Sequence, residues 1–215
     1  MEVYTKRFHD RHLYLHIDEN EAEGLDHDVF KALIAEYGKP LQSIVSSTSV
    51  HVIELLKQAG FIRKRICFPM NVCKADLSAP LPDRPCALTE ARRGTPGFDA
   101  CAEQMFAYYR DTHAAVNPLT ASEAMFAAEL PDTVLYTEKN GRIAGAFVEE
   151  NEIAYVFLDP GTDFGCFADA LLFVMFDRFT RIEFEADDTD PAATLLRNRF
   201  SFEPSEHFDT YIKMP

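Results

Sequence analysis

Residues 140–170 constrain the fold of this chain most strongly. They read NGRIAGAFVEENEIAYVFLDPGTDFGCFADA. Asn140-Gly141 is typical of a tight turn between two strands, and the apolar stretch at 152–158 predicts a buried strand. A loop that holds Gly165 then leads into a helix. The sequence therefore predicts a strand that ends at a helix N-terminus, where free backbone N–H groups and the helix dipole favour an anionic ligand.

Regular strands and helices are predicted on both sides of this segment. A stretch at 74–85, KADLSAPLPDRP, carries three prolines and has no periodicity, which is typical of a linker. Before it, the patterns predict strands at 13–17, 42–46 and 61–70 and helices at 26–37 and 49–59. After it, they predict strands at 87–92, 133–138, 142–149, 152–158, 181–186 and 207–214, and helices at 98–109, from 120 onward, at 167–178 and at 190–199.

Capping residues support several of these helices. Thr120 and Glu123 have the spacing of a capping box. Asp190 and Pro191 have the order of an N-cap and a first-turn proline. Ser49 is a candidate N-cap for the helix that ends before Gly60.

The second half of the chain resembles the GNAT superfamily of acyl-CoA N-acyltransferases in its order of elements, β-α-α-β-β-β-α-β-α-β. In that family the central strand ends in a loop patterned Arg/Gln-x-x-Gly-x-Gly/Ala. Here Thr162, Gly165 and Phe167 stand at the three patterned positions, so only Gly165 matches.

The first half resembles the second half of the same fold. Family members commonly end in Asn-x-x-Ala-x-x-Leu-Tyr-x-x-x-Gly-Phe followed by a strand. The corresponding residues are Asp190, Ala193, Leu196, Arg197, Ser201 and Phe202 in the second half, and Ser49, Val52, Leu55, Leu56, Gly60 and Phe61 in the first. The alternative to a duplicated unit is that a helix followed by Gly-Phe and a strand is a common arrangement in α/β proteins.

The expected fold is α/β (α+β). It combines a GNAT-like mixed, mostly antiparallel sheet flanked by helices with a preceding half-size β-α-β-α-β unit of the same type. The expected domains are a truncated GNAT-like unit at 1–73, a linker at 74–85 and a complete GNAT-like acetyltransferase domain at 86–215.

The resemblance implies an acyl-CoA-dependent N-acetyltransferase in which a small amine attacks the thioester directly, with acetyl-CoA as acyl donor. The pantetheine arm is expected along the central strand, and the diphosphate at the loop that follows it. The implied binding residues are Phe157, Leu158 and Asp159 for the arm, and Asp163, Phe164, Gly165, Cys166, Phe167 and Ala168 for the diphosphate. In the first half, the matching loop at 18–28 holds six carboxylates, so cofactor is expected in the second half only.

Two residues depart from the family pattern. The loop holds no Lys or Arg, and Asp163 lies inside it. A carboxylate about 5 Å from a phosphate costs about 1 kcal/mol in water and about 3 kcal/mol at an effective dielectric of about 20. Asp163 is therefore either a repulsive charge or a helix N-cap turned away from the ligand. Arg197 replaces the family's Tyr and can stabilise a thiolate but not protonate it; otherwise it is a solvated helix residue.

Several side chains are candidates for the general base. Glu149 and Glu150 lie at the end of a predicted strand, where a carboxylate can deprotonate an amine directly or through water. Exposed hairpin glutamates are otherwise only solubilising. Tyr109 and His113 are further candidates near the acceptor side.

Composition limits the partners. The net charge is −14, from 21 basic and 35 acidic residues, and such a surface repels nucleic acid and anionic membranes. The five cysteines lack paired spacing, so a cytoplasmic protein without a bound metal is expected. We expect a monomer or homodimer that binds a small-molecule amine. The functional alternative is a non-catalytic GNAT-like protein that binds a ligand or a partner.

Overall fold

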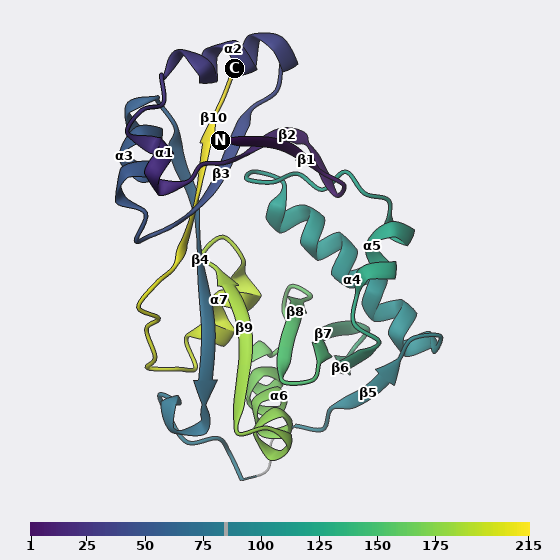
Figure 1. Cartoon of the computed structure of the whole chain (residues 1–215). Helices are drawn as coiled ribbons and strands as arrows, with labels where there is room; N and C mark the ends of the chain where they lie inside the picture. The colour runs from purple at the N-terminus through teal and green to yellow at the C-terminus, as the bar shows by residue number, and fades with distance from the viewer. Residues whose placement is uncertain (84–85) are drawn as a thin grey trace. The chain divides into compact units, whose positions relative to one another are not determined.

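The computed structural model describes residues 1–83 and 86–215 and contains two compact units (Figure 1). The first unit comprises Met1–Phe68, His113–Ala121 and Ser205–Pro215, and the second comprises Pro69–Thr112 and Ser122–Pro204. Among the residues described, no helix is both long enough and apolar enough to cross a bilayer.

The first unit is built on five strands in the order β1-β2-β3-β10-β4. Strands β2 and β3 are parallel, whereas β10 lies antiparallel between β3 and β4. The elements are β1 (Glu2–Lys6), β2 (His9–His16), α1 (Glu19–Ala22), α2 (Asp28–Tyr37), β3 (Leu41–Ser46), α3 (Val50–Gln58), β4 (Ile62–Cys73) and β10 (Phe208–Lys213). Only the residues of β4 up to Phe68 belong to this unit. The sequence patterns did not predict β1 or α1.

Helices α2 and α3 contribute to an apolar core on one side of this sheet. Phe30 and Leu56 are fully buried with Leu41 of β3, and the rings of Phe30 and Phe61 meet edge to face at 5.2 Å. The apolar spacing that predicted these helices therefore marks the faces that they bury.

The N-terminus of α3 is capped by a different residue from the one predicted. Ser49 is the N-cap position but its side chain makes no capping bond. The Glu19 carboxylate instead accepts hydrogen bonds from the backbone N–H of His51 at 2.9 Å and of Val52 at 3.5 Å. A charged cap from a distant helix carries no local sequence signal, so the pattern could not reveal it.

The second unit contains strands β9, β8, β7, β6 and β5 in that order, next to the remainder of β4. The pairs from β5 to β8 are antiparallel, whereas β8 and β9 are parallel. This confirms the predicted mixed, mostly antiparallel sheet flanked by helices. The elements are η1 (Lys74–Asp76), β5 (Thr89–Arg92), α4 (Pro96–His113), α5 (Glu123–Glu129), β6 (Thr133–Lys139), β7 (Arg142–Glu149), β8 (Glu152–Leu158), α6 (Phe164–Arg178), β9 (Arg181–Asp187) and α7 (Pro191–Arg197).

The predicted cap of α7 is confirmed. The Asp190 carboxylate accepts hydrogen bonds from the N–H groups of Ala192 and Ala193 at 2.9 and 3.1 Å, and from the Tyr108 hydroxyl at 2.6 Å. Burial raises the pKa of Asp190, and the three donors oppose that rise. Tyr108 thus attaches α4 to the start of α7.

The cap of α5 is a correction. Ser122, not Thr120, is the N-cap, and its hydroxyl accepts from the N–H of Met125 at 3.3 Å. The Thr120 hydroxyl accepts from the backbone N–H of Asp10 in the first unit. Two hydroxyl residues close together made the sequence signal ambiguous.

The two compact units divide the chain differently from the expected domains at 1–73 and 86–215. Strand β10 belongs to the first unit, where Thr210 pairs with Ile44 of β3 and with Arg65 of β4. The last strand thus completes the N-terminal sheet. Duplication of a GNAT-like unit stays a prediction. Part of the expected linker, residues 84–85, lies outside the described residues.

Candidate functional site

Strands β8 and β9 separate along their length (Figure 1). Their parallel ladder holds one residue pair, Glu152 with Glu183, next to a bond from the N–H of Glu183 to the carbonyl of Asn151 at 2.9 Å. Beyond Glu152, the edge of β8 that faces β9 makes no further ladder pair in the described chain. A split between parallel strands leaves backbone groups available to an extended ligand.

A β-bulge lies near the start of this split. Phe147 of β7 pairs with Tyr155, whereas Val148 pairs with Ile153, so Ala154 is an extra residue in β8. A bulge bends its strand and increases the local twist. The bulge therefore gives a local cause for the divergence of β8 from β9.

Strand β8 leads into the N-terminus of α6. The helix begins at Phe164, three residues earlier than predicted, because Asp163 is its N-cap and accepts from the N–H of Cys166 at 3.1 Å. The N–H of Phe167 already donates to the carbonyl of Asp163. The N–H groups of Phe164 and Gly165, which have no partner within a helix, therefore remain for a ligand.

Gly165 lies in the first turn of α6 without a structural reason to be glycine. Its φ is not positive, and a Cβ there would meet only the Asp163 carboxylate, at an ordinary 3.5 Å. Glycine costs about 1 kcal/mol relative to alanine within a helix. An exposed glycine that neither backbone conformation nor packing requires leaves room for a ligand to approach the backbone closely.

A cavity of about 670 Å³ lies at this helix N-terminus. Residues of the loop after β8 line one side of it, and the ends of β6 and β7 line the other. The lining residues are Cys86, Thr137, Lys139, Asn140, Arg142, Gly161, Thr162, Asp163 and Cys166. Burial and the neighbouring Cys166 thiol raise the pKa of the Cys86 thiol to about 12, so Cys86 stays protonated at neutral pH.

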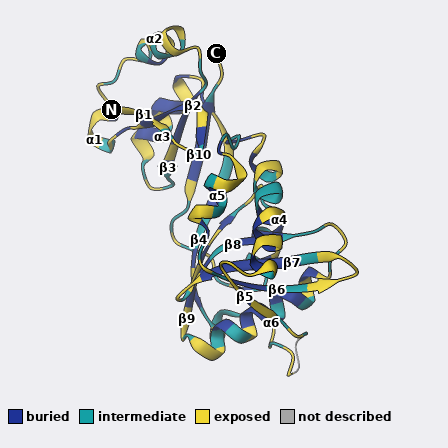
Figure 2. Cartoon of the chain, turned by 90° about the vertical axis from the view of Figure 1, so that its right-hand side faces the viewer, coloured by how far each residue is buried: buried dark blue, intermediate teal, exposed yellow. Residues whose placement is uncertain are grey.

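Other predicted binding residues have buried side chains. Phe157 and Phe167 are 1% and 0% exposed, and Ala168 is 0% exposed. Figure 2 shows the buried course of β7 beside β8. A Cβ on Gly145 of β7 would lie 2.6 Å from the Phe157 ring, so Gly145 makes room for that ring. The side chains at these positions are therefore not available to a ligand, and the N–H of Phe167 is already used within α6. The N–H of Asp159 already donates to the carbonyl of Ile143.

The predicted base candidates Glu149 and Glu150 lie at the opposite end of β8. They are exposed in the β7–β8 turn and line a separate cavity of about 440 Å³. The six residue steps from Glu152 to Leu158 span about 20 Å. These glutamates are therefore far from the α6 N-terminus, at the closed end of the split.

Glu152 is a base candidate that the sequence did not single out. It forms the last β8–β9 pair before the split. Partial desolvation raises the pKa of its carboxyl, and the nearby charges of Glu185, Glu149 and Glu183 raise it further. Its signal was absent from the sequence because Glu183 and Glu185 become its neighbours only through the pairing of β8 with β9.

Three other candidates lie as follows. Tyr109 packs in an aromatic cluster, with its ring 6.2 Å from that of Tyr155 on β8. Arg197 donates to the Glu203 carboxylate at 2.5 Å. His113 belongs to the first unit, where its ring lies 6.5 Å from that of His9.

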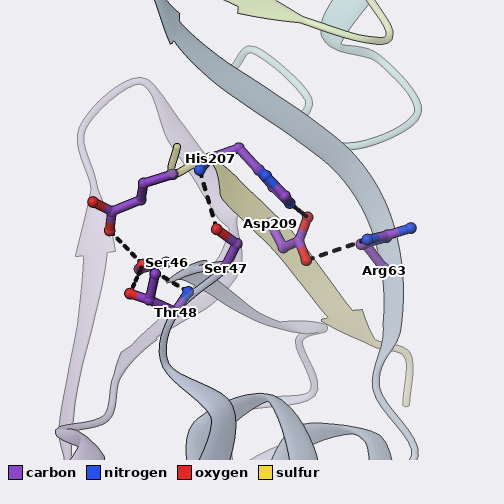
Figure 3. Close-up of polar contacts among 7 residues, drawn as sticks. Ser46, Ser47, Thr48, Arg63, His207 and Asp209 are labelled. Atoms are coloured by element: carbon purple, nitrogen blue, oxygen red, sulfur yellow. Dashed lines mark hydrogen bonds and ion pairs between the residues drawn. The ribbon is translucent and has the colours of Figure 1, made fainter. Parts of the chain in front are cut away.

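The first unit contains a polar cluster of its own (Figure 3). Asp209 is 3% exposed and contacts Arg63 at 3.3 Å and His207 at 3.6 Å. Ser47 lies nearby, but its hydroxyl accepts from the backbone N–H of His207 rather than meeting the imidazole. The cluster therefore joins β10 to β3 and β4 and lacks the geometry of a nucleophile with its base. Across the described chain, no three His, Cys, Asp or Glu side chains are grouped to hold a metal ion.

This chain is similar to several solved structures, among them two GCN5-related N-acetyltransferases and a probable N-acyltransferase. A GCN5-related N-acetyltransferase from Sphaerobacter thermophilus is 16% identical, with 99% of this chain and 75% of that chain covered at a TM-score of 0.52. One from Kribbella flavida is 15% identical, with 94% and 80% covered at 0.52. A probable N-acyltransferase from Enterococcus faecalis V583 is 8% identical, with 99% and 57% covered at 0.55.

At these identities the similarity establishes the fold, and the chain therefore has the GNAT fold. A comparison with known protein families gave no match, and a search of curated protein sequences gave none.

Proposed function

We propose that this chain is an acyl-CoA-dependent N-acetyltransferase that acts on a small amine. The observation that carries the proposal is the split between β8 and β9, which leads to a helix N-terminus with free N–H groups, an unexplained Gly165 and an adjoining cavity. An extended ligand anchored by phosphates at α6 and lying along β8 reaches the region of Glu152.

The reaction needs little covalent chemistry from the protein. The amine nitrogen attacks the thioester carbonyl carbon, a C–N bond forms, and the C–S bond breaks. In this proposal Glu152 accepts the proton that the nitrogen loses, directly or through water. The thiolate leaves and is protonated from solvent. Acetyl-CoA supplies the activated acyl group, while β8 orients it and α6 holds its phosphates.

A non-catalytic GNAT-like binding protein is the alternative. Asp163 already occupies one N–H group at the start of α6, and Arg197, at the position of the family's Tyr, is paired with Glu203. Both observations fit a site that lacks some of the residues needed for catalysis but still binds a ligand.

Calorimetric titration with acetyl-CoA separates the two proposals. Micromolar binding, followed by release of free thiol in the presence of a panel of small primary amines, supports the transferase. Absence of binding at millimolar acetyl-CoA favours the alternative.

Gly165→Ala is expected to raise the melting temperature and to weaken acetyl-CoA binding. Alanine improves the helix by up to about 1 kcal/mol, whereas its methyl group occupies the space left for the ligand. Gly24→Ala is the matched control, because a Cβ at Gly24 meets nothing within 4 Å and its φ is not positive. If Gly165→Ala leaves the affinity for acetyl-CoA unchanged, Gly165 is not needed to make room for the ligand.

Asp163→Asn is expected to tighten acetyl-CoA binding about fivefold or more while leaving stability nearly unchanged. Asn retains the cap, and the substitution removes a negative charge that lines the cavity. Asp163→Ala should also tighten binding but cost about 1 kcal/mol of unfolding free energy, since the cap is lost. Titration calorimetry and urea denaturation measure the two effects. Equal or weaker binding in both variants contradicts the prediction.

A further inference from the structure

Two basic side chains face the cavity from the β6–β7 hairpin. Lys139 ends β6, Arg142 begins β7, and the two residues pair directly across the strands. The turn between them is tight, with φ of 57° at Asn140 and 73° at Gly141. Residues opposite each other on paired strands project to the same face. The hairpin therefore presents two adjacent cations to the cavity at the start of α6.

The loop after β8 is shaped around Arg142. The Arg142 guanidinium donates to the carbonyl of Pro160. Gly161 has φ of 87°, and a Cβ there would overlap the guanidinium. Glycine is thus required at this position both by the backbone and by the close approach of Arg142. The guanidinium is consequently held against the loop that leads to α6.

The local charge is opposite to that of the whole chain. The cavity is lined by two cations and by one carboxylate, Asp163, in a chain of net charge −14. Arg142 donates to a neutral carbonyl and pairs with no carboxylate among residues 1–83 and 86–215. Over the same residues, the side chain of Lys139 makes neither an ion pair nor a hydrogen bond. Two neighbouring cations without counter-ions favour a bound anion.

Thr162 stands where the family pattern has Arg or Gln, and it cannot attract an anion by charge. Thr162 carries no charge, and its hydroxyl donates to the carbonyl of Asp159 at 2.8 Å. Lys139 and Arg142 bring positive charge to the same loop from a different part of the chain.

We propose that Lys139 and Arg142 form a binding site for the phosphate groups of an organic diphosphate, together with the N–H groups of Phe164 and Gly165. Under the proposed function, on which this assignment of the ligand rests, the diphosphate is that of the acyl-CoA. The hairpin then replaces the Arg or Gln that the loop lacks.

The test compares wild type with Lys139→Gln, Arg142→Gln and the double variant. Each is titrated with acetyl-CoA and with inorganic pyrophosphate, at low and at high salt. Lys57→Gln, an exposed residue on α3 of the first unit, is the control for net charge. S-acetylpantetheine, which carries the thioester without phosphates, is the control for the acyl-binding part of the site.

The expected result is a rise of about fivefold to tenfold in the acetyl-CoA dissociation constant for each single variant and a larger rise for the double variant. The dependence of binding on salt should weaken in the same order. Lys57→Gln should behave as wild type, and turnover of S-acetylpantetheine should be unaffected. Arg142→Gln also removes the bond to Pro160, so Lys139→Gln, which breaks no intramolecular bond in the described chain, is the decisive variant.

The outcomes separate this inference from the proposed function. If wild type binds acetyl-CoA and both Lys139→Gln and the double variant stay within twofold of it, the cation site is rejected and the transferase stands. If wild type binds pyrophosphate through these cations but not acetyl-CoA, the anion site is supported and the transferase is rejected. Binding of neither probe rejects both.

Discussion

Glu152→Gln is expected to lower kcat/KM by about a hundredfold or more, because a positioned general base contributes on the order of 10²–10⁴ to the rate. Acetyl-CoA affinity should change little, since Glu152 lies at the end of β8 away from α6. Steady-state kinetics with the best amine and titration calorimetry measure the two quantities. A loss of less than fivefold in kcat/KM contradicts the role of Glu152.

The pH profile tests the same residue. A base acts when it is ionised, so wild-type kcat/KM should fall as the pH drops through the pKa of Glu152, which lies above the ordinary value of about 4.3. Glu152→Gln should lack this acidic limb. Glu183→Gln is the matched control: it removes one of the charges that raise the pKa of Glu152, so the limb should move to lower pH with the activity at neutral pH retained.

Phe167→Ala is expected to lower the free energy of unfolding by about 3–5 kcal/mol, the usual cost of emptying a buried aromatic site. Phe167 is fully buried, and its ring centroid lies 5.6 Å from that of Phe164. The family pattern has a small residue here, so the substitution restores the pattern while removing packing. Urea denaturation measures the change.

Phe173→Ala on the same helix is the control. Phe173 is 41% exposed, and its truncation should cost less than about 1 kcal/mol. If the two variants lose similar stability, Phe167 is not a core residue in solution, and the loop has the freedom that a small residue would give it.

Local patterns predicted the second unit well because its elements carry their own signals. The Asn140-Gly141 turn has positive φ at both residues, and Asp190 caps α7. Strands β6, β7 and β8 begin at the residues that the sequence predicted. The GNAT fold, expected from this order of elements, is confirmed.

The features that the sequence did not predict depend on contacts between residues that are distant in sequence. Glu19 caps α3 from another helix. Lys139 lines the same cavity as the loop after β8 only because β6 pairs with β7 and β7 pairs with β8. The role of Asp163 could not be decided from the sequence, which allowed either a helix N-cap or a charge at the ligand site. In the structure Asp163 caps α6 and also lines the cavity.

The position of β10 has a consequence for biosynthesis. This strand lies between β3 and β4, so the N-terminal sheet has a gap until residues 208–213 have been synthesised. A nascent chain that has passed only the first hundred residues exposes two unpaired strand edges, which favour aggregation or capture by chaperones. Pairing of Leu41 with Lys213 spans most of the sequence, and such long-range contacts slow folding. The first unit is therefore completed only after the residues of the second unit have been synthesised.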